Sequence, residues 1–74
     1  MTKTEQLIRQ AIRELHIDIE PHNKTLNIVA DTETPGTYRV TGENRKGESM
    51  QLNINMDADY KIILAQLRDA WRAK

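Results

Sequence analysis

The fold is decided near the end of the chain, where residues 49–72 have the sequence SMQLNINMDADYKIILAQLRDAWR. At the start of this stretch apolar residues alternate with polar ones, as at Met50 and Leu52. A period of two residues indicates a strand that buries one face. From Tyr60 to Trp71 apolar residues recur every three or four positions, which predicts a helix. A strand is therefore followed directly by a helix.

The beginning of the chain predicts a second helix, over residues 3–15. Its apolar residues form one stripe at helical spacing: Leu7, Ile8, Ala11, Ile12 and Leu15. Thr2 and Glu5 have the spacing of a capping box, in which side chains satisfy the free N–H groups of the first turn. Glu5 and Arg9 are spaced to form an ion pair on the helix surface.

Three or four strands are expected between the two helices. They cover residues 17–20, 25–30, 37–41 and 49–55, the first being either a short strand or an extended linker. Polar turn sequences separate them, and Asn55 or Asp57 is expected to cap the last helix. Short connections favour an antiparallel meander. The predicted fold class is α+β, a two-layer α-β-β-β-α sandwich with both helices packed on one face of the sheet.

The alternation along the strands also predicts a polar outer face of the sheet. The residues expected to face the helices are Tyr38, Val40, Met50, Leu52, Ile54 and Met56. The residues expected to face away are Arg39, Thr41, Gln51, Asn53 and Asn55, with Asp18, Glu20 and Asn27 as further candidates and Val29 as an apolar member. Polar residues on the solvent face of an antiparallel sheet are ordinary. As a functional surface, this face would be a hydrogen-bonding platform for a partner.

Composition limits the kinds of chemistry available to the chain. Its 74 residues are expected to form a single domain, 1–74, with 11 basic and 11 acidic residues and a formal net charge of zero. Proteins that bind a phosphate backbone normally carry a basic excess. The absence of cysteine excludes disulfides and Cys-ligated metal sites and fits a reducing compartment. Without an apolar leader or a run of about 20 apolar residues, the chain is expected to be cytoplasmic and free of membranes.

The sequence contains no motif that indicates catalysis. His16 and His22 have no partners at metal-ligand spacing and are expected to be structural or solvated. The single serine, Ser49, lacks the surroundings of a nucleophile elbow. The three glycines belong to separate turns, so they form no phosphate-binding loop. We therefore expect no enzymatic activity, no cofactor and no metal.

The order helix, three strands, helix resembles the topology of double-stranded RNA-binding domains and of small toxins of the HicA type. The unit from Gly36 to Trp71 is similar to the sheet-plus-helix DNA-binding modules of integrases, which are more basic. The RNA-binding domains carry lysines at the start of their last helix, where this chain has Asp57 and Asp59. The toxins need a histidine beside a glycine-rich segment, which the two histidines here match only in part. The resemblance therefore concerns topology, and no site residue is carried over.

Three functional hypotheses follow. The first is a small non-catalytic binding protein that acts through protein–protein interaction, as a regulator, an inhibitor or a phage- or plasmid-type accessory factor. The alternative is a nucleic-acid-binding module that uses a basic hairpin and the C-terminal helix, with Arg39, Arg45, Lys46, Lys61, Arg68 and Arg72 as the contact residues. The third is a homo-oligomer that pairs with a copy of itself through a sheet edge, with the strand at 17–20 or 25–30 as its natural interface, or through the open sheet face. Zero net charge favours the first.

Overall fold

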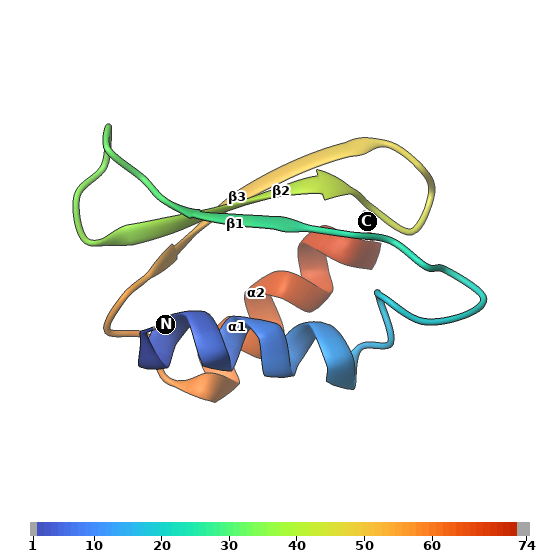
Figure 1. The fold of residues 1–74 in the computed structure, drawn as a ribbon, viewed down its shortest axis with the longest axis horizontal. Coiled ribbons are helices and arrows are strands. Elements are labelled where there is room, and N and C mark those ends of the chain that lie inside the picture. The colour runs from blue at the N-terminus through green and yellow to red at the C-terminus, as the bar shows by residue number, and fades with distance from the viewer. Residues whose placement is uncertain (1, 73–74) are drawn as a thin grey trace.

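The computed structural model describes residues 2–72, and in this range two helices and a three-stranded sheet follow one another in the predicted order (Figure 1). The elements are α1 (Lys3–Glu14), β1 (Asn27–Ala30), β2 (Thr37–Glu43), β3 (Ser49–Asn55) and α2 (Tyr60–Arg72). Neighbouring strands are antiparallel, with β2 in the centre and β1 and β3 at the edges. Both helices lie on one side of the sheet (Figure 1). The predicted two-layer α+β sandwich is confirmed, with three strands.

The first helix begins as its sequence predicts and ends one residue earlier. Thr2 is the N-cap, and its Oγ1 accepts a hydrogen bond from the N–H of Glu5 at 3.2 Å. The Glu5 carboxylate accepts a hydrogen bond from Arg9 at 3.3 Å, which is the expected surface pair. Leu15 is the C-cap, and His16 after it has a φ of 59°, the left-handed conformation that commonly ends a helix.

The predicted strand at residues 17–20 is wrong. Ile17 is fully buried, but Ile19 is 48% exposed, and the backbone here forms turns. The carbonyl groups of Ile17 and Ile19 accept hydrogen bonds from the N–H groups of residues 22–24. Because these local bonds occupy the carbonyls that a sheet would use, the segment stays outside the sheet although its sequence alternates.

The first strand is shorter than predicted and begins at Asn27. The residues before it pass close to β2 at Gly42. A Cβ atom on Gly42 would lie 2.6 Å from Cδ2 of Leu26 and 3.2 Å from the carbonyl oxygen of Thr25. Glycine therefore allows the two backbones to approach at this point, and β2 continues to Glu43.

The turn between β2 and β3 is organised by Asn44. Its Oδ1 accepts hydrogen bonds from the N–H groups of Lys46 at 2.9 Å and Glu48 at 3.0 Å. Gly47 has a φ of 83°, as expected for the glycine of this turn. The N–H of Arg45 donates to the carbonyl of Trp71 at 3.0 Å, so the turn is fastened to the end of α2.

The predicted cap of the last helix, at Asn55 or Asp57, is wrong. Asp59 caps α2, since its Oδ1 accepts a hydrogen bond from the N–H of Ile62 at 3.1 Å. Asn55 is the last residue of β3, and its carbonyl accepts a hydrogen bond from the N–H of Ala58 at 3.1 Å. A turn therefore separates the strand from the helix and shifts the cap toward the C-terminus.

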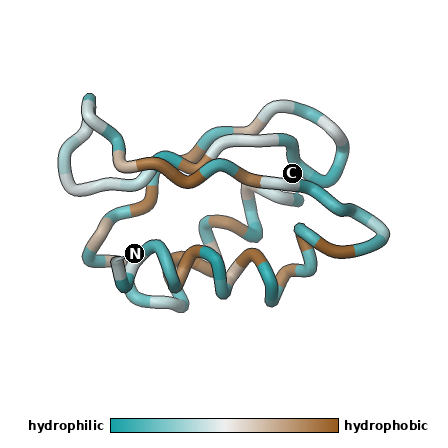
Figure 2. The backbone as a smooth tube through the Cα atoms, in the orientation of Figure 1, coloured by the Kyte–Doolittle hydropathy of each residue, from teal (hydrophilic) through white to brown (hydrophobic). Residues whose placement is uncertain are grey.

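The core lies between the sheet and the two helices. Figure 2 shows that apolar stretches recur along α1, α2 and the strands. The buried apolar residues are Ile8, Ala11, Ile12, Ile17, Leu26, Tyr38, Val40, Met50, Ile54, Ile63, Leu67 and Trp71. Trp71 is 4% exposed, as predicted for a core residue, and its ring meets that of His22 edge-on at 5.2 Å between centroids. Met56 was expected in the core but follows β3 and is 37% exposed.

Two polar contacts join segments that are distant in the sequence. The hydroxyl of Thr4 donates a hydrogen bond to the carbonyl of Met56 at 2.6 Å. The hydroxyl of Tyr60 donates to the carboxylate of Glu14, and this hydrogen bond raises the pKa of Tyr60 to about 12. The first contact fastens α1 to the connection between β3 and α2, and the second fastens it to the first residue of α2. Within residues 2–72, neither helix has the length and apolar character needed to cross a membrane.

Candidate functional site

The candidate site is the outer face of the sheet, on the side away from both helices (Figure 1). The strand register forms four rows of side chains on this face: Asn27–Thr41–Gln51, Val29–Arg39–Asn53, Thr37–Asn55 and Glu43–Ser49. Directly opposed residues share a face, so the structure brings together all five predicted residues, Arg39, Thr41, Gln51, Asn53 and Asn55. Asn27 belongs to the same face, and Val29 is 52% exposed on it. Asp18 and Glu20 do not belong to it, because they lie in the turns between α1 and β1.

A hydrogen-bonded cluster around Asp31 fixes one end of this face. Its Oδ1 accepts a hydrogen bond from Nη2 of Arg39 at 3.0 Å, and its Oδ2 accepts one from Nδ2 of Asn53 at 2.6 Å. The N–H groups of Glu33 and Thr34 also donate to Oδ1, at 2.9 and 3.3 Å. The Asn53 hydrogen bond, with the two N–H donors and the charge of Arg39, lowers the pKa of Asp31 against the opposing effect of burial. Asp31 is therefore charged at neutral pH and orients both Arg39 and Asn53.

Asp31 is absent from the site residues predicted from the sequence. In the sequence it opens a polar loop, and its spacing with Glu33 indicates only a solvated acidic pair. A signal was present, because Asp followed by a short polar loop is typical of a turn in which the carboxylate accepts backbone N–H groups. Its contacts with Arg39 and Asn53, however, depend on the register of three strands, which the sequence does not state.

The six basic residues of the nucleic-acid hypothesis do not form one patch. Arg39 lies on the outer face and forms ion pairs with two acidic residues of the β1–β2 loop, at 3.0 and 3.6 Å. Arg45 and Lys46 lie in the β2–β3 turn, beside the last turn of α2. The basic residues of α2 are on its exposed side, at Lys61, Arg68 and Arg72. The sheet therefore separates Arg39 from the basic residues of α2.

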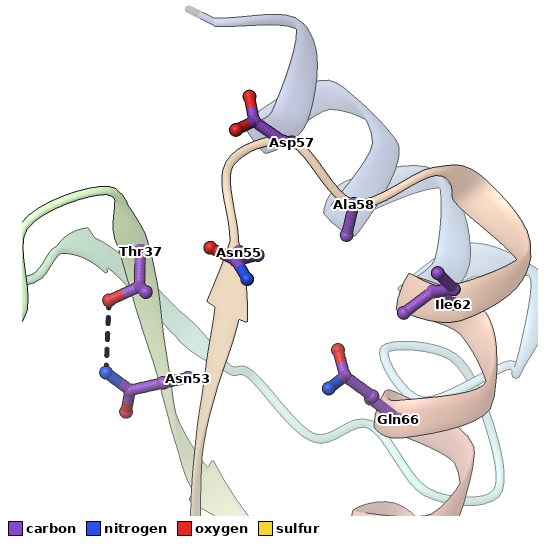
Figure 3. A pocket seen from close by; sticks show the side chains of 7 residues that line it. All are labelled: Thr37, Asn53, Asn55, Asp57, Ala58, Ile62 and Gln66. Atoms are coloured by element: carbon purple, nitrogen blue, oxygen red, sulfur yellow. Dashed lines mark hydrogen bonds between the residues drawn. The ribbon is translucent and has the colours of Figure 1, made fainter.

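A second surface feature lies at the edge of the sheet formed by β3. A hollow of about 270 Å³ is lined there by Thr37, Asn53, Asn55, Asp57, Ala58, Ile62 and Gln66. In Figure 3, Ile62 and Gln66 point from α2 into this hollow, Ala58 points into it from the preceding connection, and Asp57 points away. Ile62 is 50% exposed. The hollow therefore combines an apolar wall with amide groups.

The outer face and the β3 edge offer hydrogen-bond donors and acceptors in fixed positions. Among residues 2–72, no three or more His, Cys, Asp or Glu side chains gather in a way that would hold a metal ion. The amide and hydroxyl groups of the outer face can both donate and accept hydrogen bonds. Comparisons of the chain with protein-family models, with curated proteins and with solved structures gave no match.

Proposed function

We propose that the chain is a small non-catalytic binding protein that acts through protein–protein interaction, as a regulator, an inhibitor or an accessory factor. The outer face of the sheet is its binding surface. The observation that carries this proposal is that both helices cover the opposite face, so the outer rows of polar side chains are left open (Figure 1). A cytoplasmic location belongs to the same proposal, because a chain without cysteine suits a reducing compartment.

The chemistry of the outer face suits a protein surface better than a nucleic acid. Its amides and hydroxyls both donate and accept hydrogen bonds, as the polar groups of a protein surface require. Phosphate binding depends on cations that neutralise phosphate groups. The charge of Arg39 is already paired with Asp31 and Glu33, and Lys24 beside this face is paired with Glu43.

The face is also organised before a partner arrives. Arg39 and Asn53 are both held by Asp31, and Asn53 donates a further hydrogen bond to Oγ1 of Thr37 at 3.1 Å. Side chains that are fixed in advance lose less conformational entropy when they bind. Val29, which lies in the same row as Arg39, supplies an exposed apolar contact.

The test is affinity capture from a lysate with paired variants of the chain. Asn27→Glu/Val29→Glu places two new negative charges on the outer face, on the strand farthest from β3. Gln6→Glu/Gln10→Glu places the same added charge on exposed positions of α1 and is the matched control. We expect the wild type and the control to retain the same protein, with or without nuclease treatment, and the outer-face variant to lose it.

Two outcomes would contradict the proposal. Equal capture by all three proteins would show that the outer face is not the binding surface. Loss of capture after nuclease treatment would favour the nucleic-acid alternative, and binding should then weaken steeply as salt is raised. In that case Arg45→Ala/Lys46→Ala should reduce the salt dependence, because these residues would contact phosphates.

A further inference from the structure

The edge of the sheet at β3 exposes a row of backbone donors and acceptors. The N–H of Met56 donates to the carbonyl of Gly36 at 2.9 Å, and that of Asn44 donates to the carbonyl of Glu48 at 2.8 Å. In an antiparallel pair, residues that bond to the neighbouring strand alternate with residues that point away from it. The even-numbered residues of β3 therefore bond to β2. The backbone groups that point to the open edge belong to Ser49, Gln51, Asn53 and Asn55.

This edge lacks the features that usually prevent strands from pairing. Natural sheet edges are commonly short or carry a proline, a lysine or a bulge. β3 has seven residues, spans about 24 Å, contains no proline or charged residue, and pairs with β2 without a bulge. Within residues 2–72, no other residue bonds to the backbone of Ser49, Gln51 or Asn53 on the open side. The opposite edge is weaker, since β1 has four residues.

We propose that the β3 edge is occupied by β3 of a second copy of the chain, paired antiparallel about a two-fold axis. The outward-pointing residues are centred on Leu52, so an axis at this residue pairs all of them. Gln51 then lies opposite Asn53 of the second copy, and Ser49 lies opposite Asn55. The backbone groups of Gln51 and Asn53 complete the middle of the ladder. At its ends the N–H of Asn55 donates to the carbonyl of Ser49, because the Asn55 carbonyl already accepts from the N–H of Ala58. The amide and hydroxyl side chains meet on the outer face.

The side of the strand that faces the helices is self-complementary as well. The same axis places Met50 opposite Ile54 of the second copy and brings the two Leu52 side chains together. Met50 and Ile54 are already buried in the core of each copy, so the two partly buried Leu52 side chains make the new apolar contact beneath the joined sheet. Ile62, which is half-exposed beside the end of β3, becomes covered by the second copy's strand (Figure 3).

The charges at the two ends of β3 select the antiparallel orientation. The turn before the strand contains Arg45, Lys46 and Glu48, with a net charge of +1, whereas the connection after it contains Asp57 and Asp59. Antiparallel pairing brings the positive turn of each copy to the negative connection of the other, whereas parallel pairing would oppose like charges. The closed dimer has one six-stranded sheet, with all four helices on one side and one continuous outer face.

The test is the oligomeric state of purified protein, measured by sedimentation over a wide concentration range. The wild type is expected to form a dimer. Gln51→Pro removes an outward-pointing N–H that β2 does not use, so it should weaken the dimer by about tenfold or more while the circular dichroism spectrum stays folded. Gln51→Ala, the matched control, keeps that N–H and should remain dimeric.

A second pair of variants leaves the backbone of the sheet unchanged. Ile62→Glu places a charge in the hollow beside β3 and should weaken the dimer, whereas Ile19→Glu changes an equally exposed isoleucine away from this edge and should not. A wild type that stays monomeric at every concentration overturns the proposal, as do equal dimer affinities for Ile62→Glu and Ile19→Glu. A monomer that captures another protein through this edge overturns it too. The outer-face variant Asn27→Glu/Val29→Glu should stay dimeric, so failure of the dimer is distinguishable from failure of the proposed function.

Discussion

The carboxylate of Asp31 joins three segments of the chain, because it accepts hydrogen bonds from its own loop, from Arg39 on β2 and from Asn53 on β3. These donors, the Asn53 amide first, lower its pKa in the folded state below the ordinary value of 3.8. A carboxyl group with a lowered pKa stabilises the folded state at pH values above its unfolded pKa. This contribution is lost as the pH falls through the folded pKa.

Asp31→Asn is therefore expected to lower the urea midpoint of unfolding at neutral pH, because an amide places N–H donors against those of Arg39 and Asn53. The difference between wild type and variant should start to shrink as the pH falls through the ordinary value of 3.8, where the unfolded chain takes up the proton. It should vanish only at a lower pH, where the folded carboxyl group is protonated as well. Urea unfolding followed by circular dichroism at several pH values measures this. The control is Glu33→Gln, since the Glu33 side chain is 83% exposed and its pair with Arg39 is 3.6 Å long. A difference for Asp31→Asn that is independent of pH would contradict this account.

At the scale of the elements, Gly42 decides how closely the chain before β1 can approach β2. It has a φ of 155°, and a side chain on it would overlap with Leu26 and press on the carbonyl of Thr25. Gly42→Ala is expected to lower the free energy of unfolding by about 1–3 kcal/mol, as overpacking in a folded interior does. Chemical denaturation measures this value.

The matched control for this substitution is Gly47→Ala in the β2–β3 turn. Gly47 has a φ of 83°, and no atom lies within 4 Å of where its Cβ would be. Gly47→Ala should therefore lower the free energy of unfolding only because alanine must adopt the left-handed conformation, which costs about 1–2 kcal/mol. If Gly42→Ala were tolerated without loss of stability, the close approach at Gly42 would not be a constraint on the fold.

The elements that the sequence predicts well are those with one period over their whole length. The alternation in β3 and the stripe in α1 each continue for several turns or pairs, so tertiary contacts agree with the local pattern. The segment 17–20 offers two apolar residues in alternation, which is too short a pattern to outweigh local hydrogen bonds. The predicted cap of α2 is wrong for a related reason. Asn55, Asp57 and Asp59 can all cap a helix, and the choice depends on where the turn after β3 ends.

Considering the whole molecule, Trp71 holds the last helix against two distant loops. Its ring contacts His22, and its carbonyl accepts the N–H of Arg45. Trp71→Ala is expected to lower the free energy of unfolding by about 3–5 kcal/mol. The total free energy of unfolding of a domain of this length is roughly 4–11 kcal/mol, so the loss is a large part of it. Thermal unfolding followed by circular dichroism should show a strongly lowered midpoint. His22→Ala removes only the ring contact and should cost about 0.5–1.5 kcal/mol. Equal costs for the two variants would contradict the role given to Trp71.

The sequence could predict those parts of the candidate site that depend on the pattern within one strand. Membership of the outer face follows from alternation, so Arg39, Thr41 and Gln51 were placed correctly relative to the helices. The Asp31 cluster depends on strand register. Whether the β3 edge is open depends on where α2 lies beneath the sheet. The position of α2 leaves Ile62 half-exposed beside this edge. Both are relations between elements, and a periodic pattern within one element carries no information about them.

The hydrogen bond between Thr4 and Met56 joins residues 52 positions apart, and this has a consequence for biosynthesis. Translation proceeds at about 5–20 residues per second, so the ribosome makes α1 roughly 3–10 seconds before the segment against which it docks. During this interval the apolar face of α1 has no sheet to pack against. Synthesis of β3 and the connection after it, rather than emergence of α1, therefore sets the moment at which the domain can assemble.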